Sequence, residues 1–116
     1  MRERRPGETR MEALSGTWVP VVGGTVICHY DIGVVDKGAI GIILSVTDVP
    51  DNRFSVVIFT NGAVRRFDAE ENAYLLRPLV LSNLLDEDYD YQDADTARRQ
   101  FQEGYFEKVF GGLRAI

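Results

Sequence analysis

Between residues 24 and 79, short runs of β-forming residues alternate with turn residues, and this pattern strongly limits the folds open to the chain. The runs are rich in valine, isoleucine and phenylalanine, and glycine, asparagine, aspartate or proline separates them. Short strands at such spacing are typical of a β-barrel or β-sandwich. We expect five strands, at residues 25–30, 39–47, 53–60, 63–67 and 74–77, with one helical turn at 68–73. The sequence therefore predicts a mainly β fold, a five-stranded small barrel over residues 18–80.

Turn residues and alternation give the prediction more detail. Asn61-Gly62 indicates a β-hairpin with a type I′ turn, which needs positive φ at both central positions. Gly38 and Gly41 lie where a strand must bend or where another backbone must come close. The third run is apolar on both faces, which predicts that one face packs inside the barrel and the other against something else. The expected core contains Val26, Ile40, Ile42, Leu44, Val56, Ile58, Phe67 and Leu76.

Residues 36–43, Asp-Lys-Gly-Ala-Ile-Gly-Ile-Ile, resemble the Gly-x-x-Gly-x-hydrophobic core of KOW-type barrels, within a segment that resembles an SH3-like barrel. The same plan is similar to small uncharacterised barrel proteins of bacteria and phages. The resemblance covers about half of the chain, and it implies a fold rather than a function, since small barrels have many unrelated roles. The chain departs from nucleic-acid-binding KOW barrels in its first long loop, residues 31–38, where Lys37 is the only basic residue.

Composition and charge restrict the classes of function. The chain has 116 residues and a formal net charge of −5, which disfavours non-specific binding to nucleic acid. Its single cysteine, Cys28, cannot form an internal disulfide and fits a reducing compartment. Neither a signal peptide nor a run long enough to span a membrane is expected. We therefore expect the protein in the cytoplasm, or in a phage particle that is assembled in the cytoplasm.

Few residues could carry catalysis or bind a metal. His29 is the only histidine, and its neighbour Cys28 points to the opposite face of the same strand, so a Cys–His pair fails on geometry. Asp86, Asp88 and Asp90 are spaced like the start of a calcium-binding EF-hand loop. However, the glycine and glutamate that such a loop requires at its sixth and twelfth positions are missing. We expect no enzymatic activity, no cofactor and no metal.

The two ends of the chain differ from the barrel. Residues 1–17 are expected to be a polar, basic arm. Residues 81–116 are expected to be a solvated acidic linker and an amphipathic helix over 96–113, capped by Asp93 or Asp95 and ended by Gly111-Gly112. The aromatic stripe of this helix either packs on its own barrel or docks on a partner or a second copy. The residues predicted to contact a partner are Phe101, Tyr105, Phe106, Val109 and Phe110, with Arg65 and Arg66.

Two functions follow from these observations. The first is a non-catalytic structural or adaptor protein that joins a larger assembly, a phage particle or a multisubunit complex, through its arm and its aromatic helix. The alternative is a KOW-like module that binds nucleic acid or the transcription and translation machinery, against which the acidic charge counts. If the helix packs on its own barrel, we expect the binding surface in the loop at residues 31–38, together with Arg65 or Arg66.

Overall fold

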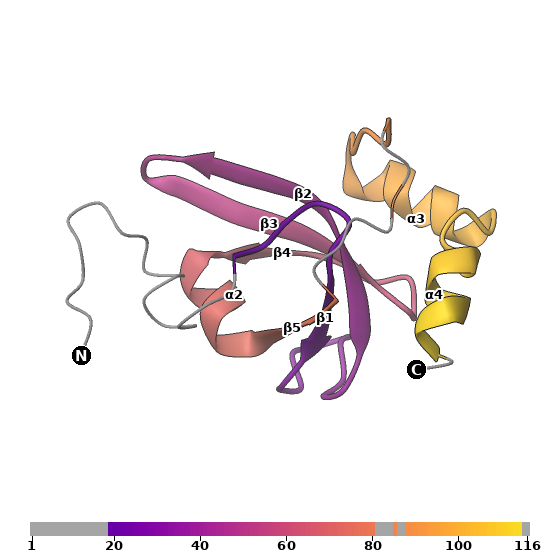
Figure 1. Cartoon of the computed structure of the whole chain (residues 1–116), viewed down its shortest axis with the longest axis horizontal. Helices are drawn as coiled ribbons and strands as arrows, with labels where there is room; N and C mark the ends of the chain where they lie inside the picture. The colour runs from indigo at the N-terminus through magenta and orange to yellow at the C-terminus, as the bar shows by residue number, and fades with distance from the viewer. Residues whose placement is uncertain (1–18, 81–84, 86–87, 115–116) are drawn as a thin grey trace.

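The five predicted strands form one antiparallel sheet that curls into a half-barrel (Figure 1). The structure is a computed structural model, and it describes residues 19–80, 85 and 88–114. The elements in chain order are β1 (Thr25–Cys28), β2 (Ile40–Val49), β3 (Asn52–Phe59), β4 (Val64–Asp68), α2 (Ala69–Leu75), β5 (Leu76–Val80), α3 (Ala94–Gln102) and α4 (Glu107–Arg114). The strand order is β4-β3-β2-β1-β5. The predicted mainly β fold with five strands and a C-terminal helix is confirmed. The arm predicted over residues 1–17 lies outside the described residues.

Two irregularities in pairing help the sheet to curl. Along β2, Ile43 pairs with Val57 and Ser45 with Val56, so Leu44 has no partner and forms a bulge. The register of β1 against β5 also shifts, between Thr25 and Val26. A bulge bends its strand and increases the local twist, which turns a flat sheet toward a barrel.

The concave face of the sheet encloses the first of two hydrophobic clusters. From β3 this cluster includes Val57 and Phe59. The rings of Phe59 and Phe67 pack edge to face, with their centroids 6.0 Å apart. This inner cluster consists of Val26, Cys28, Val35, Ile43, Val57, Phe59, Phe67 and Leu76, all at most 1% exposed. Burial of this continuous apolar surface is the main stabilising contribution within the barrel.

A second cluster lies on the opposite face of the sheet, beneath α3 and α4. It consists of Ile42, Leu44, Ile58, Leu85, Ala97, Phe106 and Phe110, with Ile40 partly buried at its edge. The prediction that β3 is buried on both faces is confirmed, and the C-terminal helices cover the second face (Figure 1). Placing Ile40, Ile42, Leu44 and Ile58 in one barrel core with Val26 was wrong, because these four side chains pack in the cluster beneath the helices.

The helix α2 connects β4 to β5 and is fixed at its start by reciprocal hydrogen bonds. The Asp68 carboxylate accepts from the Glu71 backbone N–H at 2.8 Å, and the Glu71 carboxylate accepts from the Asp68 N–H at 3.0 Å. This capping box satisfies two backbone donors at the helix start. Buried Asn72 then accepts from the Ser55 hydroxyl at 2.8 Å, which ties α2 to β3. The predicted helical turn before the last strand is therefore present as a short helix.

Gly41 of β2 shows why the sequence needs a glycine in that strand. A Cβ atom at this position would lie 2.5 Å from Cγ1 of Val57 and 3.0 Å from the carbonyl oxygen of Ile58. No side chain fits at such distances unless β3 moves away. The predicted close approach of another backbone at Gly41 is confirmed. Gly38, expected at a strand bend or a close approach, lies instead in the turn before β2, with a φ of 90° and open space around it.

The single helix predicted over residues 96–113 is wrong: the chain forms two helices, α3 and α4. Gly104 has a φ of 85°, and Glu103 N–H donates to the carbonyl of Arg99 at 3.0 Å where α3 ends. A glycine in this left-handed conformation is a common helix stop. By contrast, Gly111, which was predicted to end the helix, lies inside α4 with open space around it. Asp93 caps α3, as predicted, by accepting from the Thr96 N–H at 2.7 Å.

Candidate protein-binding surface

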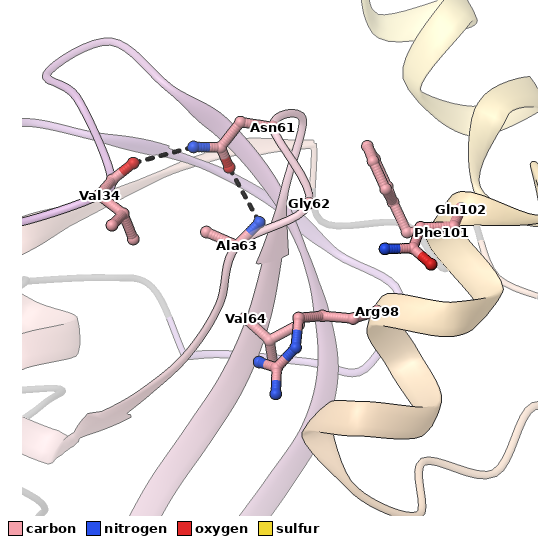
Figure 2. A pocket seen from close by; sticks show the side chains of 8 residues that line it. All are labelled: Val34, Asn61, Gly62, Ala63, Val64, Arg98, Phe101 and Gln102. Atoms are coloured by element: carbon pink, nitrogen blue, oxygen red, sulfur yellow. Dashed lines mark hydrogen bonds between the residues drawn. The ribbon is translucent and has the colours of Figure 1, made fainter.

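Within the described part of the chain, a hollow between the β3–β4 hairpin and α3 is a candidate binding surface (Figure 2). It combines three segments that are far apart in the sequence: the loop at residues 31–38, the hairpin turn and α3. Its volume is about 450 Å³, and it is open to solvent. The residues that line it are Val34, Asn61, Gly62, Ala63, Val64, Arg98, Phe101 and Gln102.

The hairpin turn gives the hollow a fixed wall. Gly62 N–H donates to the carbonyl of Phe59 at 2.8 Å, and Phe59 N–H donates to the carbonyl of Ala63 at 2.8 Å. Gly62 has a φ of 88°, whereas Asn61 does not have positive φ. This is the pattern of a three-residue hairpin loop that ends in a bulged glycine. The predicted hairpin is present, but the predicted type I′ turn is wrong.

Asn61 links the turn to the long first loop. Its side-chain amide donates to the carbonyl of Val34 at 2.8 Å, and its side-chain oxygen accepts from the Ala63 N–H at 2.9 Å (Figure 2). The loop carries a further internal bond, in which the Asp31 carboxylate accepts from the Lys37 N–H at 2.7 Å. These bonds hold the Val34 side chain at the edge of the hollow with 74% of its surface exposed.

The other wall is α3, which approaches the turn through the ring of Phe101. A Cβ atom on Gly62 would lie 3.0 Å from Cδ2 and Cε2 of this ring, so Gly62 serves both the turn and the contact with the helix. Arg98, one helical turn before Phe101, forms an ion pair with Asp95. The hollow thus has an apolar lining from Val34, Ala63, Val64 and Phe101, with polar groups around it.

The aromatic residues predicted to contact a partner divide into two groups. Phe106 and Phe110 are 0% exposed and pack against the sheet, so a partner cannot reach either ring while the helices remain docked. Phe101 lines the hollow, Val109 is half-buried against the same cluster, and Tyr105 is 40% exposed. Of the helix's predicted contact residues, Phe101 and Tyr105 therefore offer the most accessible surface.

Arg65 and Arg66 lie on opposite faces of β4, as predicted from their adjacent positions in a strand. The Arg65 guanidinium lies 4.5 Å from the ring centroid of Phe67, and it forms an ion pair with Glu71 at 3.0 Å. The Arg66 guanidinium lies 3.7 Å from the ring centroid of Phe54. Neither arginine is among the residues that line the hollow, so the structure does not bring them together with Phe101.

The segment before α3 packs more closely than a solvated linker would. Asp88 and Asp90 are exposed, but Tyr89 and Tyr91 pack against the cluster beneath the helices. The Tyr89 ring lies edge to face with Phe106 at 6.1 Å, and its hydroxyl donates to Gln100 Oε1 at 3.1 Å. The tyrosines therefore anchor this part of the segment, which corrects the prediction of a solvated tether. Residues 81–84, 86 and 87 lie outside the described part of the chain.

Alkaline pH is expected to weaken this anchor. Burial, together with the nearby charges of Tyr105, Tyr91 and Asp90, raises the pKa of Tyr89 from 10.0 to about 12. Because the folded state favours the neutral hydroxyl, its stabilising contribution is complete below pH 10 and is lost as the pH rises to about 12. We expect urea denaturation to show a loss of stability across this interval that is smaller in Tyr89→Phe. An equal loss in both chains would contradict the assignment.

Comparisons with known proteins identify no relative: no family model matches the chain, and neither a curated protein nor a solved structure matches it significantly. Within the described residues, no group of three or more histidine, cysteine, aspartate or glutamate side chains could hold a metal ion. None of the described helices is long and apolar enough to cross a membrane.

The sequence predicted Phe101 and the loop containing Val34 as parts of two alternative binding surfaces, not of one. It missed Asn61 as the residue that connects them. A signal was present, since an asparagine in a turn commonly bonds to nearby backbone groups. Its bond to Val34, however, depends on how the long loop folds over the sheet, and no local pattern encodes that distance.

Proposed function

We propose that the chain is a non-catalytic structural or adaptor protein that docks into a larger assembly, such as a phage particle or a multisubunit complex formed in the cytoplasm. The barrel is of the SH3-like, KOW-type class, and the order β5-β1-β2-β3-β4 with α2 between the last two strands supports this assignment. The hollow beside α3 is the contact surface for a protein partner.

The observation that carries this function is the exposed apolar lining held by a rigid frame. Val34 is 74% exposed, although valine is among the residues most often buried. The hydrogen bond from Asn61 and the contact between Gly62 and Phe101 hold the walls in place before any partner arrives. A prearranged site loses little conformational entropy on binding, so a small apolar contact can contribute fully to affinity. A partner segment that inserts one apolar side chain would match this geometry.

Site-specific photo-cross-linking tests the proposal. A photoreactive amino acid replaces Gln102 at the hollow, or Val49 at the far end of the β2–β3 hairpin, in the full chain. Val49 is also exposed, at 48%, and serves as the control position. Each chain is added to a lysate of the cells in which the protein is naturally made. We expect a discrete protein adduct from position 102, and none from position 49.

A matched pair of surface variants gives the second arm of the test. Val34→Asp places a charge at the hollow, whereas Val49→Asp places the same charge at the control position. Val34→Asp leaves the carbonyl that accepts from Asn61 in place, so the fold should be retained in both variants. We expect the adduct to disappear in the first variant only. Equal adducts in both variants, or a nucleic-acid adduct at position 102, would overturn the proposal.

A further inference from the structure

Two stacked tyrosines, neither of which lines the hollow, form an exposed aromatic platform. Tyr30 follows β1, and Tyr74 lies in the last turn of α2. The ring centroids are 5.1 Å apart and the ring planes are inclined by only 18°. Tyr30 is 44% exposed and Tyr74 is 64% exposed. Neither ring belongs to either of the two hydrophobic clusters, so packing within the described chain does not account for the pair.

The backbone on both sides of the platform is fixed. His29 N–H donates to the carbonyl of Leu75 at 2.8 Å, which joins the residue before Tyr30 to the residue after Tyr74. The Cys28 thiol donates to the carbonyl of Tyr30 at 3.1 Å. A hydrogen bond with the Tyr30 side chain raises the pKa of Tyr74 above its ordinary value of 10.0. The two rings therefore present a prearranged surface.

Acidic residues predominate in the two segments that carry the rings. Asp31 is exposed directly after Tyr30, and the loop that follows contains Asp36 and one basic residue, Lys37. The helix α2 has acidic residues in its first turn and no basic residue in its last turn. The strands that flank α2, β4 and β5, carry three basic groups: Arg65, which pairs with Glu71, Arg66, which lies over the Phe54 ring, and Arg77. The local charge thus favours a cationic ligand over an anionic one.

We propose that Tyr30 and Tyr74 form a docking site for a basic segment of a protein partner, with an arginine or lysine cation on the exposed ring surface and Asp31 as counter-charge. The negative face of an aromatic ring attracts a cation, and an arginine guanidinium can also stack flat on it. A strand of nucleic acid could stack its bases on the same rings, but its phosphates would be repelled by the acidic surroundings. This site is independent of the hollow, because no residue of one lines the other.

To test this site, the full chain is titrated with a short peptide of alternating glycine and arginine. Binding is monitored through the NMR signals of the tyrosine ring protons. The same peptide with neutral citrulline in place of arginine is the ligand control. We expect Tyr74→Leu to weaken binding by about 2- to 5-fold, the range of an exposed cation–π contact, and Tyr74→Phe to have little effect. Tyr105→Ala, at another exposed tyrosine, is the control variant. Asp31→Asn should weaken binding most at low salt.

Four results would overturn this proposal. The first is equal binding of the citrulline peptide, and the second is binding that Tyr74→Leu leaves unchanged. The third is tighter binding of a single-stranded oligonucleotide. The fourth is a gain in affinity for the arginine peptide when four arginines are changed to glutamine: Arg2, Arg4, Arg5 and Arg10. The last result would mean that the chain's own N-terminal segment competes for the platform. Val34→Ala, which removes apolar surface from the hollow without changing the charge of the loop, should leave the titration unchanged, so failure at this platform is distinguishable from failure at the hollow.

Discussion

The double variant Phe106→Ala with Phe110→Ala is expected to lose a large part of the chain's stability. Both rings are 0% exposed and pack on the outer face of the sheet with Ile42, Leu44 and Ile58. Truncation of a buried phenylalanine typically costs about 3–5 kcal/mol through lost transfer free energy and the cavity left behind. The two rings lie 6.3 Å apart, so their effects should couple rather than simply add. The free energy of unfolding is measured by urea denaturation of the monomer.

This experiment also decides the role of the C-terminal helices. If both are part of the domain, the double variant loses the helical signal and the sheet signal in one transition. Tyr105→Ala is the matched control, because Tyr105 is a helix-region aromatic that remains 40% exposed, and we expect a much smaller loss. A double variant that stays as stable as the parent but leaves its natural assembly would contradict the packing. It would instead support the helices as an attachment device.

The strands could be predicted from sequence because their signals are local. Runs of β-branched and aromatic residues bounded by Asn61-Gly62 or by the turn at Pro50 define where strands begin and end without reference to the rest of the chain. The exact turn type could not be predicted in this way. Asn-Gly fits both a type I′ turn and a three-residue loop with a bulged glycine, and the pairing of Phe59 with Ala63 decides between them.

The division of the core into two clusters depends on tertiary packing, so local patterns could indicate it only in part. Alternation along β3 separates Ile58 from Val57 and Phe59, but it does not say which face is inside the barrel. The bulge at Leu44 adds a further residue that the strict alternation of β2 cannot anticipate. Both faces were correctly expected to be buried. Naming the inner one required knowledge of where α3 and α4 pack.

In the C-terminal helices and at the tyrosine pair, too, local sequence patterns predict only part of the structure. Residues Ala97, Phe101, Tyr105 and Val109 recur every four positions, which favours one continuous helix. Gly104 interrupts that helix, and after the break Phe106 and Phe110 face the sheet instead of Tyr105. A glycine within a helical pattern is a recognised stop signal, so this break could have been predicted. The stacking of Tyr30 on Tyr74 could not, because the residues between them include three strands.

Ile58→Ala is expected to cost about 2–5 kcal/mol of stability, since it removes a fully buried branched side chain. Ile58 lies between β3 and the helix pair, in the cluster with Leu44 and Phe110. The opposite face of the same strand, at Val57 and Phe59, lies in the inner cluster. One strand therefore belongs to both clusters. A cavity at Ile58 should lower the stability of the barrel and of the helices together.

The measurement is urea denaturation followed by circular dichroism for the helices and by amide hydrogen exchange for the strands. Val49→Ala is the matched control, because Val49 lies near the exposed β2–β3 turn at 48% exposure and should change stability little. A loss below about 1 kcal/mol for Ile58→Ala would mean that the outer face of β3 is not packed as described. If hydrogen exchange accelerated in α3 and α4 but not in β3 and β4, the two clusters would be separate cooperative units. The helices could then detach from a barrel that stays folded.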